Sequence, residues 1–141
     1  MRSFVLDAST TLSWHFKDEV TDRVRAIARR AFAGAVAVPQ HWYLEVLSGL
    51  IRGERRERTS AEVTETFLAQ LDELSIEVHS TDALALREDV LPLARAHRLT
   101  IYDAVYLDLA RRLDLPLATL DASLGRAARK LGIALIEEDG R

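Results

Sequence analysis

Four acidic residues stand where the strands or helices of an alternating α/β chain would begin or end: Asp7, Glu45, Asp103 and Asp121. The first and the last of them directly follow apolar runs at residues 4–6 and 117–120. In a parallel sheet the carboxyl ends of the strands form one rim, and ligands bind there. Carboxylates that are far apart in the sequence can therefore meet at that rim, where their oxygens would suit a hard divalent cation.

Clustered carboxylates of this kind indicate an enzyme that hydrolyses phosphodiesters. That reaction needs a strong nucleophile at neutral pH and a positive charge beside the phosphoryl oxygens, and a divalent cation supplies both. Magnesium and manganese prefer carboxylate ligands, whereas zinc prefers histidine or cysteine. The chain has no cysteine, its four histidines have no metal-binding spacing, and His41 is interpreted as an ordinary polar residue. The pattern therefore indicates a nuclease that uses magnesium or manganese.

Each of the four acids also has a purely structural interpretation. Asp7 and Asp121 are suitable N-caps for the helices expected after them. Asp103 would lie in the first turn of a helix opened by Thr100, where an acid also suits the helix dipole. Glu45 borders the apolar stripe of its helix and could extend its carboxylate into solvent. The position at the rim favours a functional role for Asp7, whereas local geometry leaves both interpretations of Asp103 open.

Three hydroxyl-bearing residues are predicted to hold these acids in place: Ser9, Thr10 and Thr119. Hydrogen-bonding groups around a ligand side chain orient it toward the metal. Repulsion opposes the gathering of the acids, because two carboxylates ~5 Å apart repel by roughly 3 kcal/mol at an effective dielectric constant of about 20. Such crowding requires a cation, protonation or neighbouring arginines.

Hydrophobic periodicity and turn residues predict the elements that position the acids. Strands are expected at 3–6, 35–38, 76–78, 117–120 and 133–136. Helices are expected at 22–33, 43–53, 60–74, 82–97, 101–113 and 122–131. Pro92 should kink or divide the helix at 82–97, and the apolar residues of 60–74, Val63 included, should face the core. Strands that alternate with helices predict an α/β fold with a small parallel sheet covered on both faces.

Size and composition predict one soluble domain that covers residues 1–141. No apolar run approaches the ~18 residues needed to span a bilayer. Because the chain has no cysteine, it needs no oxidising compartment, and a cytoplasmic protein is expected. The formal net charge of -3 argues against nonspecific binding of nucleic acid.

Two groups of arginines are nevertheless candidates for contacts with RNA phosphates. One group falls in the helix at 22–33 and the other at the end of the helix at 43–53 and just beyond it: Arg25, Arg29 and Arg30, then Arg52, Arg55 and Arg56. Such contacts would position RNA without reading its sequence. The alternative is that these arginines lie on solvated helix faces and form salt bridges with Glu54 and Glu57.

Four segments in this order resemble a PIN-domain ribonuclease, and more narrowly the VapC-type toxin of a bacterial toxin–antitoxin pair. They are Val-Leu-Asp-Ala-Ser at 5–9, Trp-Tyr-Leu-Glu-Val at 42–46 after Pro39, Tyr-Asp-Ala-Val-Tyr-Leu-Asp-Leu-Ala at 102–110, and Leu-Ala-Thr-Leu-Asp at 117–121. The resemblance spans nearly the whole chain. No segment is specific by itself, but the four together are.

The resemblance implies both a site and partners. It implies that Asp7, Glu45, Asp103 and Asp121 are the catalytic quartet that holds Mg²⁺ or Mn²⁺. It also implies a three-layer α/β/α fold, a homodimer, RNA as the substrate, and a small antitoxin whose C-terminal segment blocks the site. Asp108 is left out of the quartet, because five residues from Asp103 it faces another side of the helix.

Two other classes of function compete with the nuclease: a phosphotransfer domain, of the phosphatase or the receiver type, and a binding module. A phosphatase of the haloacid dehalogenase type needs a second aspartate two residues after the first, where this chain has Ser9. A phosphotransfer receiver domain needs an acid at the end of a middle strand, but the strand at 35–38 is followed by Pro39 and has no acid before Glu45. A binding module without catalysis would use the acids as caps and the arginines as salt-bridge partners.

Overall fold

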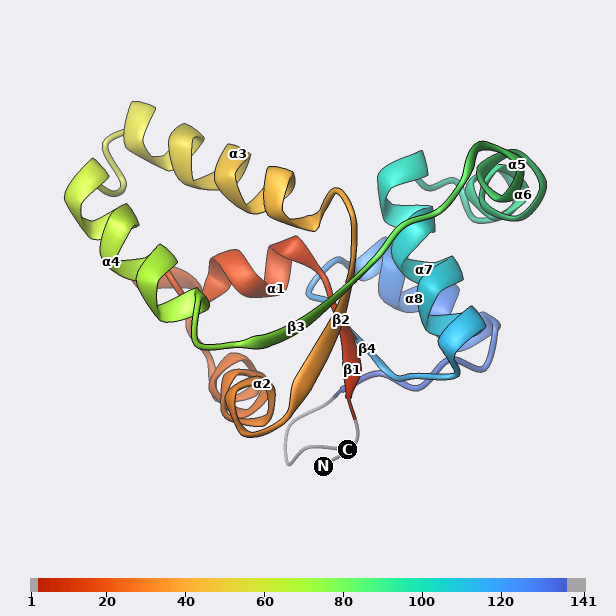
Figure 1. Cartoon of the computed structure of the whole chain (residues 1–141), viewed down its shortest axis with the longest axis horizontal. Coiled ribbons are helices and arrows are strands. Elements are labelled where there is room, and N and C mark those ends of the chain that lie inside the picture. The colour runs from red at the N-terminus through yellow and green to blue at the C-terminus, as the bar shows by residue number, and fades with distance from the viewer. Residues whose placement is uncertain (1–2, 137–141) are drawn as a thin grey trace.

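A four-stranded parallel sheet runs through the middle of the molecule (Figure 1). This computed structural model describes residues 3–136. The strand order is β3-β2-β1-β4, and the strands are β1 (Phe4–Leu6), β2 (Ala35–Pro39), β3 (Ser75–His79) and β4 (Leu117–Ala118). In the register, Val5 of β1 pairs with Ala37 of β2 and with Leu117 of β4. The first strand therefore lies inside the sheet, and its carboxyl end is flanked by two neighbours.

Helices cover both sides of this sheet, as Figure 1 shows, with α1 to α4 on one side and α5 to α8 on the other. Their bounds are α1 (Ala8–Ser13), α2 (Asp22–Ala33), α3 (Trp42–Arg55), α4 (Ala61–Leu71), α5 (Ala83–Ala85), α6 (Leu91–His97), α7 (Ile101–Leu113) and α8 (Ala122–Lys130), with a short 3₁₀ turn at Lys17–Glu19. The predicted three-layer α/β/α arrangement is confirmed. No helix within residues 3–136 is long and apolar enough to cross a membrane.

Burial differs among the strands, and of the two edge strands β4 is buried whereas β3 is partly exposed. All three residues of β1 are 0% exposed, and so are Leu117 and Ala118 of β4. Parallel strands covered on both faces become continuous apolar runs, which is why the sequence shows them as unbroken hydrophobic stretches. The edge strand β3 differs, since Val78 is 65% exposed.

The segment that contains Pro92 is divided, as the proline predicted. A π-helical turn at Leu86–Val90 separates α5 from α6, and Pro92 lies in the first turn of α6. Proline has no backbone N–H and cannot complete a regular helical hydrogen bond to the preceding turn. The π-helical turn thus accommodates the proline without a sharp break in the chain.

Two expectations from the sequence were wrong. The last predicted strand is only an isolated bridge between Leu117 and Leu135, fastened by the Leu117 N–H to Ala134 carbonyl bond of 2.9 Å. Val63 is 53% exposed, because the buried face of α4 runs through Thr64, Phe67 and Leu71. These three are spaced by three and four residues, which rotates Val63 away from the core.

Candidate acidic active site

Asp7 lies at the carboxyl end of β1 and is only 4% exposed. The Ser9 hydroxyl donates to both of its carboxylate oxygens, at 2.9 and 3.0 Å. The Thr10 N–H donates to Oδ1 at 2.9 Å, so Asp7 is also the N-cap of α1. Of the hydroxyl residues predicted to support Asp7, Ser9 acts through its side chain and Thr10 through its backbone.

Burial raises the pKa of Asp7 from its usual 3.8 to about 6, although the Thr119 hydroxyl, the Thr10 N–H and the Ser9 hydroxyl each lower it. Within residues 3–136 no lysine or arginine forms an ion pair with this carboxylate. A buried carboxylate without a cationic partner is uncommon in folded proteins. The ionised form of Asp7 is therefore stabilised only by hydrogen bonds.

Asp121 follows β4 and caps α8, where its Oδ1 accepts a hydrogen bond of 2.8 Å from the Leu124 N–H. Its own N–H donates to the Thr119 hydroxyl at 3.0 Å. Since this hydroxyl also lowers the pKa of Asp7, Thr119 lies between the two aspartates. The Asp7 N–H to Ala118 carbonyl bond of 3.2 Å joins the two strand ends directly.

Asp103 lies in the first turn of α7, where its N–H donates to the Thr100 hydroxyl at 3.1 Å. Burial raises the pKa of this half-buried carboxyl, and the negative charges of Asp121 and Glu45 raise it further; Thr100 and His41 oppose the shift. Three of the predicted acids therefore lie within electrostatic reach of one another. They come from α3, α7 and the start of α8.

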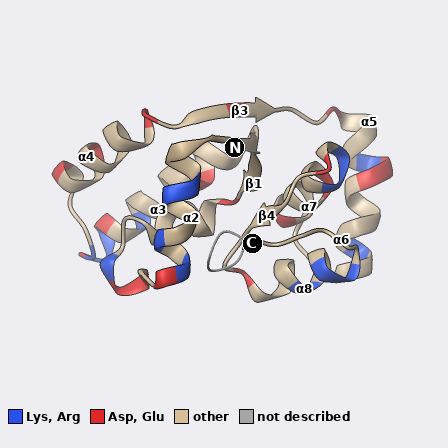
Figure 2. Cartoon of the chain, turned by 90° about the horizontal axis from the view of Figure 1, so that it is seen from below, with Lys and Arg blue, Asp and Glu red and all other residues tan. Residues whose placement is uncertain are grey.

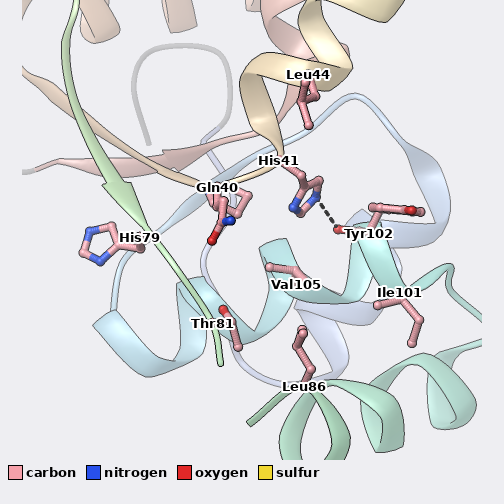
Figure 3. A pocket seen from close by; sticks show the side chains of 10 residues that line it. Gln40, His41, Leu44, His79, Thr81, Leu86, Ile101, Tyr102 and Val105 are labelled. Carbon is pink, nitrogen blue, oxygen red and sulfur yellow. Dashed lines mark hydrogen bonds between the residues drawn. The ribbon is translucent and has the colours of Figure 1, made fainter. Parts of the chain in front are cut away.

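Glu45 is held by two residues whose role the sequence did not predict. The Tyr106 hydroxyl donates to Glu45 Oε1 at 2.6 Å, and His41 Nε2 lies 3.4 Å from the same oxygen. Figure 3 shows this imidazole beside the Tyr102 carbonyl, to which Nε2 donates at 3.1 Å. His41 had been interpreted as an ordinary polar residue, but the structure places it next to the acids.

Tyr106 also links Glu45 to Asp7. Burial raises the pKa of Tyr106 far above its usual value, and the hydrogen bond and charge of Glu45 and then the charge of Asp7 raise it further. The hydroxyl therefore stays protonated and acts as a donor. Tyr106 follows Asp103 by three residues on α7, and residues with that spacing share a helix face. This spacing places Tyr106 on the same helix face as Asp103, but it does not reveal the contact with Glu45.

The four acids thus converge on one rim of the sheet, but not as a closed cage. No three Asp, Glu, His or Cys side chains within residues 3–136 are close enough together to enclose a metal ion as they stand. The donor set nevertheless fits Mg²⁺, which keeps several water ligands and is usually bound by one or two carboxylates. The mutual repulsion that raises the pKa of Asp103 is what a divalent cation would relieve.

The capping roles predicted for Asp7 and Asp121 are present and are compatible with ligand binding. An ionised carboxylate has about four lone-pair positions, and each capping bond uses one of them. Asp108, by contrast, belongs to a different cluster. It is 4% exposed and pairs with Arg111 at 3.4 Å and Arg112 at 3.7 Å.

The first group of predicted RNA-binding arginines lies on α2. The Arg30 guanidinium stacks 5.7 Å from the centre of the Phe4 ring, at the end of β1 opposite Asp7. Arg25 pairs with Asp22 at 3.1 Å, and Arg29 is exposed. None of these contacts brings a side chain of this group to the acids. A different arginine of the same helix does reach the rim, since Arg23 donates to the Thr119 carbonyl at 3.1 Å.

The second group lies on and just beyond α3. Arg52 borders a hollow of about 480 Å³ together with Ser9 and Glu45, and Arg56 borders the next hollow along the same helix. Arg55 is exposed. Within residues 3–136 these three arginines form no ion pair with Glu54 or Glu57. The structure therefore brings Arg52 beside the acids and leaves Arg56 further along α3.

Comparisons with known proteins show the family to which this chain belongs. The family model described as "PIN domain" matches residues 4–130. Ribonuclease VapC3 of Mycobacterium tuberculosis, from strains CDC 1551 / Oshkosh and ATCC 25618 / H37Rv, is 29% identical over 123 residues, which are 87% of this chain and 85% of the relative. The crystal structure of PAE2754 from Pyrobaculum aerophilum matches with a TM-score of 0.63 at 23% identity, over 89% of this chain and 78% of that one. The resemblance noted in the sequence is thereby confirmed, and the chain belongs to the PIN domain family.

Proposed function

We propose that this protein is a metal-dependent endoribonuclease that acts as the toxin of a toxin–antitoxin pair. One observation carries the proposal: carboxylates from four separate elements converge at the carboxyl rim of the sheet, where Asp121 and Glu45 raise the pKa of Asp103. Such mutual repulsion is typical of a site that binds a cation. The ribonuclease name of the similar VapC3 proteins supports RNA as the substrate.

Within this proposal, Mg²⁺ or Mn²⁺ would be held by Asp7, Glu45, Asp103 and Asp121. The ion would supply positive charge beside the phosphoryl oxygens and lower the pKa of water, as metal ions do in phosphodiester hydrolysis. Ser9 and Thr119 orient Asp7 and Asp121, and the protonated Tyr106 hydroxyl donates a hydrogen bond to Glu45. Water adds to phosphorus, a P–O bond breaks, and two shorter RNA strands leave.

We further propose a homodimer and an antitoxin that covers the acidic rim. Apolar side chains around a hollow of about 270 Å³ support a protein interface beside the site (Figure 3). Leu44 is 68% exposed and Tyr102 is 62% exposed, and exposed apolar patches commonly mark interfaces. Size-exclusion chromatography with light scattering should give twice the chain mass of 15.8 kDa. A monomer at micromolar concentration would contradict the dimer.

The direct test of the function is expression in bacteria. Wild-type protein should stop growth and leave new transcript ends that sequencing can map. Asp7→Asn should abolish both effects while the protein stays folded. Asp82→Asn is the matched control, because Asp82 caps α5 through a 2.8 Å bond to the Ala85 N–H but is exposed and apart from the acids. Equal toxicity of Asp7→Asn and wild type would refute the proposal.

A further inference from the structure

A second charged surface lies between α6 and α8, and we name it the basic hollow. It has a volume of about 410 Å³, and its charged or titratable lining residues are His97, Arg98, Arg126 and Lys130. Figure 2 shows the basic segments of α6 and α8 next to each other. None of these residues belongs to the arginine groups that the sequence suggested for RNA binding.

The cations of the basic hollow are not neutralised by carboxylates. Within residues 3–136, Arg98, Arg126 and Lys130 form no ion pair, and the bond of 3.2 Å from Arg126 is to the Ser123 hydroxyl. Arg58, by comparison, bonds to Asp18 and Glu19 at 3.0 and 3.1 Å. The positive charges of the hollow are therefore exposed together, with no ion-paired carboxylate in the part of the chain that the structure describes.

Helix dipoles explain only part of this cluster. His97 and Lys130 lie in the last turns of α6 and α8, where cations are favourable. Arg126 lies in the middle of α8, and Arg98 lies just past α6 with a left-handed φ of 54°. Glycine is the usual residue in that conformation. An arginine there adds charge at a position where the backbone favours another residue.

The residues that line the basic hollow lie on α8, which Asp121 caps, and at the end of α6, shortly before the helix that carries Asp103. Asp121 caps α8, and at 1.5 Å of rise per residue Arg126 and Lys130 follow it by about 7.5 and 13.5 Å along the helix axis. Ser123, Arg126 and Lys130 are spaced by three and four residues, so they share one helix face. Arg98 precedes Thr100, the N-cap of the helix that carries Asp103. A row of cations therefore leads away from the acidic rim.

We infer that the basic hollow binds phosphates of a single-stranded RNA segment that flanks the scissile bond. This inference rests on the proposed ribonuclease function and names how that substrate is held. The remaining lining residues are Ala96, Ser123 and Ala127, so among the lining residues His97 carries the one aromatic ring on which a base could stack. Contacts to the phosphates position a strand and do not read its sequence.

Binding of a short fluorescent single-stranded RNA tests the inference, measured by anisotropy at several KCl concentrations in the uncleaving Asp7→Asn background. The double change Arg126→Glu and Lys130→Glu should weaken binding by about tenfold or more and reduce the salt slope by about one per residue. Arg87→Glu is the matched control, because Arg87 is exposed on the π-helical turn and outside the hollow. Unchanged affinity in the double variant would overturn the inference.

Arg98→Gly distinguishes an effect of lost charge on RNA binding from an effect of reduced stability. Glycine suits the left-handed backbone at this position, so the melting temperature should rise while RNA affinity and the salt slope fall. A rise in melting temperature with unchanged affinity would overturn the role of Arg98 in phosphate binding.

Cleavage by the same variants with Asp7 restored distinguishes this inference from the function on which it rests. If wild type and the double variant cleave RNA equally well, the ribonuclease function stands and the basic hollow is not a subsite. RNA binding that requires the basic hollow, without cleavage by wild type, supports the subsite and overturns the nuclease. Absence of RNA binding by the Asp7→Asn parent overturns the subsite.

Discussion

At the scale of single residues, the least expected feature is how Glu45 is held. A glutamate side chain has several rotatable bonds, so a ligand role requires partners that fix its orientation. Tyr106 and His41 meet the same carboxylate oxygen, and Tyr106 is 1% exposed. The position of Glu45 is therefore set largely from α7, the helix that also carries Asp103.

Tyr106→Phe should lower activity more than stability. It removes the hydroxyl that donates to Glu45 and keeps the ring in the core. Loss of such an orienting partner typically costs about 10- to 100-fold in metal affinity or activity, and the lost hydrogen bond costs about 1 to 3 kcal/mol of stability. Cleavage rates over a range of Mg²⁺ or Mn²⁺ concentrations measure the effect.

Tyr102→Phe is the control for this change, because Tyr102 is 62% exposed and contacts His41 through its backbone carbonyl and its ring, both of which phenylalanine keeps. It should leave the metal dependence of cleavage unchanged. Equal behaviour of the two phenylalanine variants would contradict a role for the Tyr106 hydroxyl.

Asp7→Asn should stabilise the metal-free protein at pH 7 while it abolishes activity. A pKa raised from 3.8 to about 6 by burial means that the ionised carboxylate costs the fold about 3 kcal/mol at pH 7. Asparagine keeps a carbonyl oxygen for the Thr10 N–H and is an equally good N-cap. Thermal unfolding in EDTA should show a melting temperature several degrees higher. A lower melting temperature would contradict the destabilising effect of the ionised Asp7 carboxylate.

The four acids could be predicted from the sequence because each lies at an element boundary that local signals mark. Tyr106 and His41 could not be assigned in the same way. Tyr106 lies 61 residues from Glu45 in the chain, and their contact depends on how α7 packs beside α3. Such a contact is a property of the tertiary structure and leaves no local pattern.

At the scale of elements, helix starts place three of the acids. Asp7 and Asp121 cap α1 and α8, and Asp103 donates its N–H to the cap of α7. An N-cap has a defined backbone conformation and fixed hydrogen-bond partners. These acids are therefore held by the same bonds that begin their helices, and their positions need few additional contacts.

Thr100→Ala should impair both α7 and the site. Removal of this cap should cost about 1 kcal/mol, and the first turn of α7, which carries Asp103, should fray. Activity should fall further than the stability change alone explains. Thr100→Ser keeps an oxygen for the Asp103 N–H and should restore both activity and melting temperature. If alanine and serine were equivalent in cleavage assays, the cap would have no part in placing Asp103.

Elements with strong local signals were predicted well from the sequence. The helices at 22–33 and 101–113 agree with α2 and α7 at both ends, because caps and apolar periodicity coincide there. The prediction of a strand at 133–136 was wrong. An apolar run does not show how many backbone hydrogen bonds the neighbouring strand can form with it. Residues 134–136 meet only Leu117 of the two-residue strand β4.

At the scale of the whole molecule, charge is separated rather than evenly mixed. The formal net charge of -3 conceals a rim of converging acids with Arg52 next to Glu45, and a separate basic hollow further along α8. The net charge therefore argues against nucleic-acid binding. The local arrangement nevertheless suits the proposed function, in which basic residues hold the RNA phosphates and the acids hold the metal ion. Only the fold reveals this separation, because it depends on which helix faces share a side.

Divalent cations should stabilise the whole molecule. An ion that binds only the folded state at about 100 times its dissociation constant adds about 2.7 kcal/mol. Mg²⁺ or Mn²⁺ should therefore raise the melting temperature of wild type, and Asp7→Asn should shrink the gain. Asp82→Asn should respond as wild type does. A thermal-shift titration without any response to either ion would exclude the metal site.

The most direct measurement is the rate at which purified protein cleaves RNA with Mg²⁺ or Mn²⁺ and with EDTA, compared between wild type and Asp103→Asn. The convergence of Asp103 with Asp121 and Glu45 predicts cleavage only by wild type and only when the ion is present. Cleavage that persists in EDTA, or that survives in folded Asp103→Asn protein, would contradict the account.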